Sequence, residues 1–484
     1  PTTERALDVT HDPDEAADQY NAFISLFELA GGDGSLADLT VAVKDNIAVG
    51  GVRLTCGSSV FADAVPRRDA PVVKRLLGAG AVAGLAGCLG SDGGQADDDF
   101  PEGVRFDRGW PTYAHDDANT AFLREGTAIA EPTIEYEPDF AMDSTEPVAA
   151  DGVGYTPGDP VRAIDPAAGE ELWAAQGESW TAPVVLDGVV YSLGVTVHGP
   201  NRLALYRART GREFRTIELP GRPRTPPAFS NDRETLFLGL DDERVCAVDI
   251  DAAEVRWTRS LFGAVRRPLA VNLHSIFVVT EGQRLYCLGT DGRARWQVPT
   301  ETVEAVAPVV GDERVYIAGW DRIAALERRN GDVVWEDDRG VHERLAFDGE
   351  RLYAVRGSLR ALDSATGAER WRYNPDETVS AASIVGDTVY VGTGRGELVA
   401  LNRTDGGGPF GDRERWSMSL GRNVGHSLAA TDRRVFCPLV RDDGLFSLSV
   451  VGDADADEST AGATASAGTT ATAGTTADAG GSES

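Results

Sequence analysis

Histidine and cysteine are the side chains most often used for metal binding and for nucleophilic or acid–base chemistry, and this chain has few of either. The six histidines are His11, His115, His198, His274, His342 and His426, and no two have His-x-x-x-His spacing. The five cysteines are Cys56, Cys88, Cys246, Cys287 and Cys437, with no Cys-x-x-Cys and no adjacent pair. Phosphate loops, nucleophile elbows and zinc motifs are also missing from the sequence. The sequence therefore predicts no metal site and no active catalytic centre of these kinds.

A repeated motif covers most of the chain and must position any site that exists. Its clearest copy contains Ala361, Asp363, Gly367 and Trp371, and four copies keep alanine and tryptophan ten positions apart. The closing aromatic residues of seven copies are Trp173, Phe214, Trp257, Trp296, Trp335, Trp371 and Trp416. Phe214 closes a degenerate copy that begins at Ala204. We interpret these aromatic residues as structural, one for each repeat.

The spacing of the copies predicts the fold. A period of roughly 40 residues with short apolar runs is typical of β-propeller blades of four strands. Hairpin patterns such as 183–191 and 307–316 precede the motif. An eighth hairpin, within 425–450, has no tryptophan after it, and residues 132–136 could supply its outer strand. We therefore predict an all-β fold, an eight-bladed propeller of four-stranded antiparallel blades closed by pairing its two ends.

The Ala-x-Asp-x-x-x-Gly-x-x-x-Trp motif resembles the PQQ-like β-propeller repeat family (PQQ is pyrroloquinoline quinone), over about residues 110–452. The lead-in from Trp110 to Thr120 resembles the opening of such proteins. The resemblance raises a PQQ-dependent dehydrogenase of an alcohol or sugar, with PQQ and calcium in an axial pocket. Enzymes of that kind also use a vicinal cysteine pair, which this chain lacks. Trp180 and Trp320 lie outside the repeat position and either line the axial mouth or pack, and we favour packing.

The repeat aspartates are expected to serve structure rather than catalysis. Asp165, Asp249 and Asp363 stand just before a turn, where aspartate accepts backbone hydrogen bonds. Cys246 and Cys287 lie at or beside the small-residue position and are interpreted as core-filling side chains.

The first part of the chain has a different pattern. Residues 12–29 and 69–77 predict helices, and 39–43 a strand. Lys44, in Val43-Lys44-Asp45-Asn46, lies in an order of residues that resembles amidase-signature enzymes, among them the tRNA-dependent amidotransferases. The resemblance implies that Lys44 matches the lysine of that family's Ser–cis-Ser–Lys triad. The similarity ends near residue 81, before any matching serine segment, so Lys44 is a base without its nucleophile. We expect no amidase activity.

Residues 76–89 form a run of small apolar residues that predicts either a signal-peptide core or an ordinary helix. At about 1.5 Å per residue the run is too short to cross a bilayer. Residues 85–88 resemble a lipobox, which implies lipidation at Cys88, and residues 90–99 resemble the tether that follows one. We expect an amidase-like fragment at 1–81, a signal and tether at 76–99, the propeller at 100–452 and a disordered Ala/Thr/Gly/Ser-rich tail at 453–484. We interpret this order as a junction with its seam in 76–81, arising from a genomic fusion, a frame error or an artificial join.

The chain is strongly acidic, with 77 acidic and 46 basic residues and a formal charge of −31. Lysine occurs only at Lys44 and Lys74. An acidic, lysine-poor surface resembles that of proteins from salt-loving archaea, although an ordinary solvated acidic surface has the same composition. Without a basic stripe, nucleic-acid binding is disfavoured.

Two function classes remain, with amidase as a third and least favoured. The first is a non-enzymatic, exported, lipid-anchored propeller that binds a protein partner on its loop face or a blade edge, without a cofactor. The second is the quinone-dependent dehydrogenase, the only one of these hypotheses that requires PQQ and calcium. The first hypothesis predicts an extracytoplasmic, membrane-anchored protein if the signal at Cys88 is used, and a cytoplasmic protein if the chain stays intact from Pro1. A fold by itself does not choose between these functions.

Overall fold

The computed structural model describes residues 9–11, 25–27, 109–142, 146–176, 179, 181–194, 201–374, 380–404 and 413–454. The chain divides into two compact units, Pro1–Asp97 and Asp98–Ser484. In the first, β1 (Val9–His11) and β2 (Ser25–Phe27) pair antiparallel. The helix predicted over 12–29 is therefore wrong at 25–27, because pairing with a distant strand outweighs the local apolar pattern there. The other elements predicted before residue 100, together with Lys44 and Cys88, lie outside the described residues.

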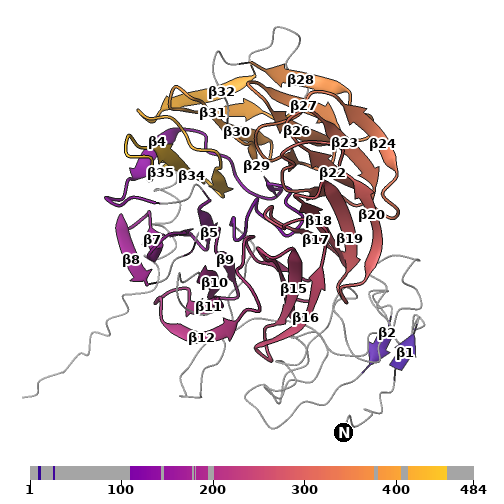
Figure 1. Cartoon of the computed structure of the whole chain (residues 1–484). Coiled ribbons are helices and arrows are strands. Elements are labelled where there is room, and N and C mark those ends of the chain that lie inside the picture. The colour runs from indigo at the N-terminus through magenta and orange to yellow at the C-terminus, as the bar shows by residue number, and fades with distance from the viewer. Residues whose placement is uncertain are drawn as a thin grey trace, which may run out of the picture. The chain divides into compact units, whose positions relative to one another are not determined.

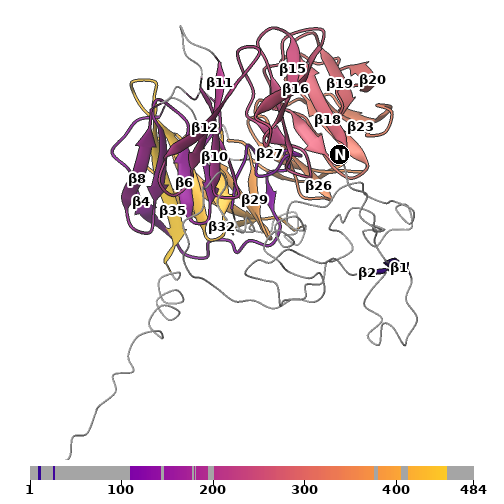
Figure 2. The ribbon, with the colours of Figure 1, turned by 90° about the horizontal axis from the view of Figure 1, so that it is seen from below.

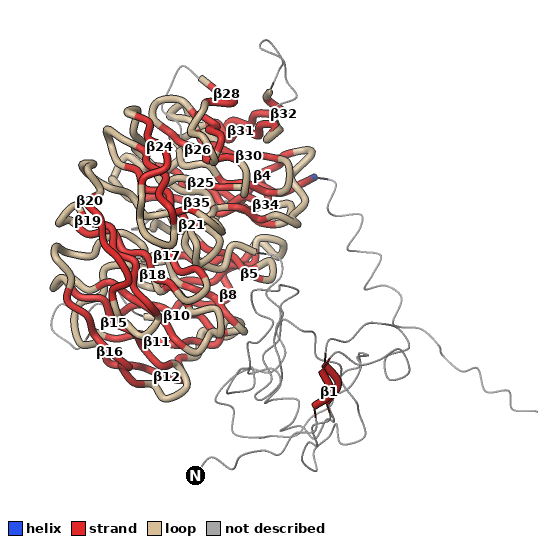
Figure 3. Tube along the Cα trace, turned by 90° about the vertical axis from the view of Figure 1, so that its right-hand side faces the viewer, coloured by secondary structure: helices blue, strands red, loops and turns tan. Residues whose placement is uncertain are grey.

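The second unit is an eight-bladed β-propeller of antiparallel blades, as the repeat predicts. Figure 1 shows the blades arranged around one axis, and Figure 3 shows their strands joined by loops and turns. Blade 1 is β5 (Val148–Ala150), β6 (Val153–Thr156), β7 (Val161–Asp165) and β8 (Glu170–Ala175). Blade 2 is β9 (Val184–Leu186), β10 (Val189–Gly194), β11 (Arg202–Arg207) and β12 (Glu213–Glu218). Blade 3 is β13 (Ala228–Phe229), β14 (Thr235–Gly239), β15 (Arg244–Asp249) and β16 (Glu254–Ser260). Blade 4 is β17 (Ala270–Asn272), β18 (Ser275–Thr280), β19 (Arg284–Gly289) and β20 (Ala294–Pro299).

The remaining blades follow the same order from the axis outward. Blade 5 is β21 (Val309–Val310), β22 (Arg314–Ala318), β23 (Ile323–Glu327) and β24 (Val333–Asp337). Blade 6 is β25 (Ala346–Phe347), β26 (Arg351–Val355), β27 (Leu359–Asp363) and β28 (Glu369–Tyr373). Blade 7 is β29 (Ser383–Val385), β30 (Thr388–Gly392), β31 (Glu397–Asn402) and β32 (Glu414–Ser419), with β3 (Phe122–Leu123) parallel to its inner strand. Blade 8 is β33 (Ala429–Thr431), β34 (Arg434–Val440), β35 (Phe446–Asp453) and β4 (Pro132–Tyr136).

The ring closes in blade 8, where β4 pairs antiparallel with β35. This confirms that residues 132–136 supply the missing outer strand. Arg434 donates to both carboxylate oxygens of Glu135 at 2.6 and 2.5 Å, which ties the second strand of the blade to the closing strand. Tyr136 stands opposite Val450, the place that a tryptophan holds in other blades. No edge is left for a ninth blade, because closure pairs both ends of the sheet order.

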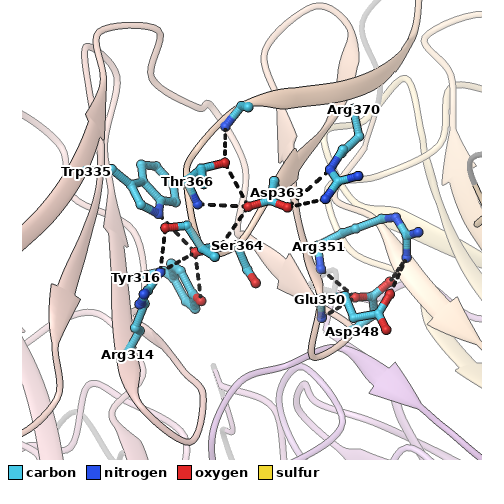
Figure 4. A network of polar contacts seen from close by, with 12 residues as sticks. Arg314, Tyr316, Trp335, Asp348, Glu350, Arg351, Asp363, Ser364, Thr366 and Arg370 are labelled. Atoms are coloured by element: carbon cyan, nitrogen blue, oxygen red, sulfur yellow. Dashed lines mark hydrogen bonds and ion pairs between the residues drawn. The ribbon is translucent and has the colours of Figure 1, made fainter.

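The repeat tryptophans join each blade to the next, and Figure 4 shows one such contact. Trp335 stands opposite Ala325, and its indole N–H donates to the carbonyl of Ser364 in blade 6 at 2.9 Å. A Cβ added to Gly367, whose φ is +75°, would lie 2.6 Å from the indole. The turn therefore needs glycine both for its left-handed backbone and for the space taken by the indole.

Other blades repeat this contact. The carbonyls that accept from the indoles of Trp173, Trp257, Trp296, Trp371 and Trp416 belong to Ala208, Thr290, Arg328, Arg403 and Ile129. In the turns, Asp363 accepts from the N–H groups of Ala365 and Thr366 at 3.1 and 2.8 Å, and Asp165 and Asp249 accept in the same way. The repeat residues therefore act as blade and turn contacts.

Blade 2 departs from the pattern, and Phe214 is not its repeat residue. Arg215, opposite Leu205, holds the tryptophan position, while Phe214 lies at the adjacent bulge. The Arg215 guanidinium donates to the carbonyl of Ile250 at 2.9 Å, as an indole does elsewhere. In the turn that faces it, Ala253 replaces the repeat glycine at a φ of +55°. A side-chain methyl group fits there because no indole fills the space.

The lead-in segment, residues 110–127, passes round the inner edge of the blades (Figure 1). Its backbone, or in one case its aspartate side chain, bonds every blade in turn. Trp110 and Ala149 each donate a backbone N–H to the carbonyl of the other. The other acceptors in the segment are, in order, Pro111, the Asp117 side chain, the Asp117 carbonyl, Ala118, Thr120, Ala121 and Thr127, and their donors, in the same order, are the N–H groups of Val185, Phe229, Val271, Val310, Phe347, Ile384 and Arg433. The segment thereby satisfies inner-strand groups that would otherwise be buried without partners. Within the described part of the chain, no helix has the length and apolarity needed to span a bilayer.

Candidate functional site

The loops that lead into the innermost strands and the turns between second and third strands lie on the same side of each antiparallel blade. We call this side the loop face; blades 3 to 6 contribute 261–269, 281–283, 299–308, 319–322 and 338–345 to it. Figure 2 shows the blades of the ring from below, at right angles to the view of Figure 1. The loop face carries the most exposed aromatic side chains of the described residues.

Phe262 is 66% exposed, yet its backbone is held on both sides. Its N–H donates to the Tyr286 hydroxyl at 3.2 Å, and its carbonyl accepts from the Thr280 hydroxyl at 2.8 Å. Gly263 and Gly282 approach so closely that a Cβ on either would clash with backbone. The ring therefore projects from a rigid support.

Trp320 is the second such residue, with 52% of its surface exposed. Its N–H donates to the carbonyl of Val303 at 3.1 Å, and Arg356 donates to its carbonyl. Its indole meets His342 edge-on, with ring centroids 6.3 Å apart. The packing favoured for Trp320 is therefore partial: the indole contacts His342, but half of its surface stays exposed in the turn after β22. Trp180 lies outside the described residues.

A hollow of about 590 Å³ is lined by Arg266 and Arg267 of the loop that carries Phe262, by the hairpin between β18 and β19, and by residues 300 and 302–305. Arg266, Arg267, Glu281 and Glu304 contribute equal numbers of positive and negative groups to it. Thr300 also lines it; this residue is 1% exposed, and its hydroxyl has no hydrogen-bond partner among the described residues. A buried hydroxyl without a partner is unfavourable unless something else supplies one. We call this the neutral hollow.

A second hollow, of about 620 Å³, is lined by Glu301, by residues 321–322 and 336–339 of blade 5, and by the turn between β27 and β28 of blade 6. Two guanidinium groups, Arg322 and Arg339, line it together with six carboxylates. These are Glu301, Asp321, Glu336, Asp337, Asp338 and Glu369. We call this the acidic hollow. The Thr302 hydroxyl donates to Asp321 at 2.5 Å and lowers the pKa of that carboxyl, which keeps it ionised.

A group of ionisable side chains also converges at the loop-face end of the axis. Arg344 is 6% exposed and donates to the carbonyl of Ala382 and the hydroxyl of Ser383, both at 2.9 Å. Glu343 contacts His426 at 2.8 Å, which joins blade 6 to blade 8 across blade 7. These contacts make Glu343 and Arg344 a clamp between blades, because they hold the starts of inner strands together.

The pKa values in this group follow from burial. Burial raises the pKa of Tyr113 and of Glu146 and lowers that of Arg344. The hydrogen bond to Glu343 raises the pKa of His426. Among these axial side chains, no nucleophile is hydrogen-bonded to a general base. Across the ranges that the structure describes, no group of three or more His, Cys, Asp or Glu side chains is placed to hold a metal ion.

Sequence reasoning missed Phe262 and the exposure of Trp320, because a single aromatic residue in a turn has no periodicity to reveal its environment. Arg215 did have a signal. In the other copies the tryptophan lies four positions after the turn glycine, or after the residue that replaces this glycine. Four positions after Gly211 is Arg215, so counting from the glycine identifies Arg215 as the residue at the tryptophan position. The closing strand 132–136 was predicted, but not that its Tyr136 takes the tryptophan position, because that depends on the register with β35.

Comparison with known proteins yields two family matches. A family model described as "Outer membrane protein assembly factor BamB" matches residues 158–337, 241–374, 281–423 and 355–471, which together span 158–471. The amidase family model matches residues 7–85. Both matches confirm the resemblances drawn from the repeat and from the region around Lys44.

The relatives cover only parts of the chain. The amidase-family component of the glutamyl-tRNA(Gln) amidotransferase of Haloarcula marismortui is 53% identical over 64 residues, 13% of this chain and 15% of that protein. Outer membrane protein assembly factor BamB of Kangiella koreensis is 40% identical over 67 residues, 13% of this chain and 17% of that protein. The chain therefore matches less than a fifth of either relative. Quinohemoprotein alcohol dehydrogenase from Comamonas testosteroni shares the fold, with a TM-score of 0.55, 13% identity, and coverage of 71% of this chain and 80% of that one.

Proposed function

Because the chain belongs to the BamB family of outer membrane protein assembly factors, we propose that its propeller is a non-enzymatic platform that binds a protein partner through the loop face. The observation that carries the proposal is the pair of exposed aromatic side chains, Phe262 and Trp320, on fixed backbone. Aromatic residues dominate binding energy at protein interfaces, and a rigid support lowers the entropy that binding costs.

The test compares three forms of the full chain in capture of proteins from source membranes. We expect the double variant Phe262→Ala/Trp320→Ala to lose at least tenfold of the partner that the wild type retains. Val333→Ala is the matched control, because Val333 is also 52% exposed but lies on the outer strand β24. Equal capture by all three forms would place the interface elsewhere and refute the proposal.

We also propose export and lipid anchoring at Cys88, which rests on the sequence pattern of 85–88 and the basic residues before it. Mass spectrometry of the protein from its source tests this. A mature chain that begins at lipid-modified Cys88 is expected. A chain that is intact from Pro1 would contradict both export and anchoring.

The proposed platform works without a bound quinone. A calcium–quinone centre needs carboxylates free to surround a cation, whereas the axial carboxylates Glu146 and Glu343 lie beside the buried positive charge of Arg344. The residues present at the axis do not fit such a centre. Calorimetry with PQQ and Ca²⁺ is expected to give no saturable heat. Micromolar binding would favour the alternative, a dehydrogenase of an alcohol or sugar.

A further inference from the structure

We infer that the segment bound at this face is an extended, basic stretch of a protein partner, with an arginine or lysine over Trp320. The inference rests on the proposed function and names the chemistry of its partner. The turn that carries Trp320 connects the two hollows: its N–H donates to the carbonyl of Val303, which lines the neutral hollow, and its chain neighbour Asp321 lines the acidic hollow. A ligand that extends from one hollow to the other therefore passes this turn.

Charge selects a basic segment. The acidic hollow has six lining carboxylates and two lining guanidinium groups. Arg360 and Arg372 pair with Asp337 and Glu369 from outside the lining, and counting them still leaves two carboxylates in excess, six against four. The formal charge of −31 adds a long-range attraction for basic partners.

The exposed indole is suited to a cation. A guanidinium or ammonium group over a tryptophan face is attracted by the ring, and Asp321, the next residue in the chain, lines the acidic hollow. Its edge contact with His342 and the bonds to its backbone fix the ring in place. A segment with several basic side chains can therefore place one over the indole and another in the acidic hollow.

The neutral hollow favours an extended main chain. Its lining balances positive and negative groups, and the Thr300 hydroxyl there lacks a partner within the described residues. A hydroxyl both donates and accepts, so it can bond a peptide N–H or C=O. Val303, which lines this hollow, and Phe262, in the loop that contributes Arg266 and Arg267 to it, offer exposed apolar surface to side chains of the same segment.

Fluorescence polarisation with the full chain tests this, using three labelled ten-residue peptides at fixed ionic strength. One alternates Arg and Leu, one replaces Arg with Gln, and one replaces Arg with Glu. We expect the Arg peptide to bind at least tenfold more tightly than the Gln peptide, and the Glu peptide not to bind. Equal affinity for the Arg and Gln peptides would overturn the basic-segment inference.

Variants separate this face from general attraction to an acidic protein. Trp320→Ala and Asp338→Asn are each expected to weaken the Arg peptide several-fold, whereas Glu170→Gln, on the distant strand β8, is expected to leave it unchanged. Equal losses in Asp338→Asn and Glu170→Gln would show non-specific attraction and overturn the inference. Thr300→Val is expected to weaken binding about threefold, and unchanged affinity would refute the main-chain contact.

The two proposals fail in different ways. If the Arg and Gln peptides bind with equal affinity but the Phe262→Ala/Trp320→Ala variant still fails to capture the partner, the basic-segment inference fails and the platform stands. If the double variant captures its partner normally, the platform itself fails.

Discussion

The contact between a turn glycine and the preceding indole leads to a quantitative prediction for Gly367→Ala. The new methyl group would lie 2.6 Å from Trp335, and the residue would keep a φ near +75°. Left-handed backbone costs an alanine about 1–2 kcal/mol, and the overlap with the indole costs about 1–3 kcal/mol. A less flexible unfolded chain offsets part of this. The free energy of unfolding should therefore fall by roughly 2–4 kcal/mol.

Gly357→Ala is the matched control in the same blade. Gly357 has a φ of +69°, and no atom lies within 4 Å of a Cβ added there. Only the backbone cost remains, so we expect a loss of about 1 kcal/mol. Denaturant titration at constant high salt, followed by circular dichroism, measures both variants.

A double-mutant cycle isolates the indole. In a Trp335→Leu background, the cost of Gly367→Ala should fall toward that of Gly357→Ala, because the clash has been removed. The reasoning is refuted if the two glycine variants cost the same within about 0.5 kcal/mol in the wild-type background.

Acid stability, ring closure and amide turnover give three more tests. The Arg370 guanidinium holds the pKa of Asp363 at about 2, below its ordinary 3.8, so this carboxylate stabilises the fold above pH 3.8 and loses its contribution as the pH falls toward 2. In the Asp363→Asn variant, the loss of unfolding free energy between about pH 4 and pH 2 should therefore be smaller than in the wild type by about 1 kcal/mol. Denaturant titrations over a pH series measure this, and an equal loss in both proteins would contradict the prediction. Glu135→Gln should weaken ring closure by about 1–3 kcal/mol, because it removes one partner of the two-bonded pair with Arg434; the melting temperature reports this, and no change would argue against closure through this pair. Assay of the full chain with a simple amide should show no turnover, because Lys44 has no matching serines, and turnover that Lys44→Ala abolishes would reverse that conclusion.

The blades could be predicted from sequence because their information is local. Alanine, glycine and tryptophan recur within each blade, so strand order, turn position and the closing strand 132–136 follow from spacing and alternation. Even Arg215 could be found by counting from Gly211. Counting from Ala204 instead selected Phe214, because Leu205 holds the alanine position in blade 2 and stands opposite Arg215, ten positions later.

Which side chains make up the proposed binding face could be seen only in the tertiary structure. Phe262, Thr300 and Trp320 belong to different connections and share no motif; they border the same surface only because consecutive blades turn about one axis. Whether Trp320 is buried or exposed depends on its neighbours Val303 and His342, which spacing does not reveal. Sequence by itself determined the repeating unit, its number and its outer closure. The folded ring decided which side chains reach solvent together, because exposure depends on contacts between segments far apart in the chain.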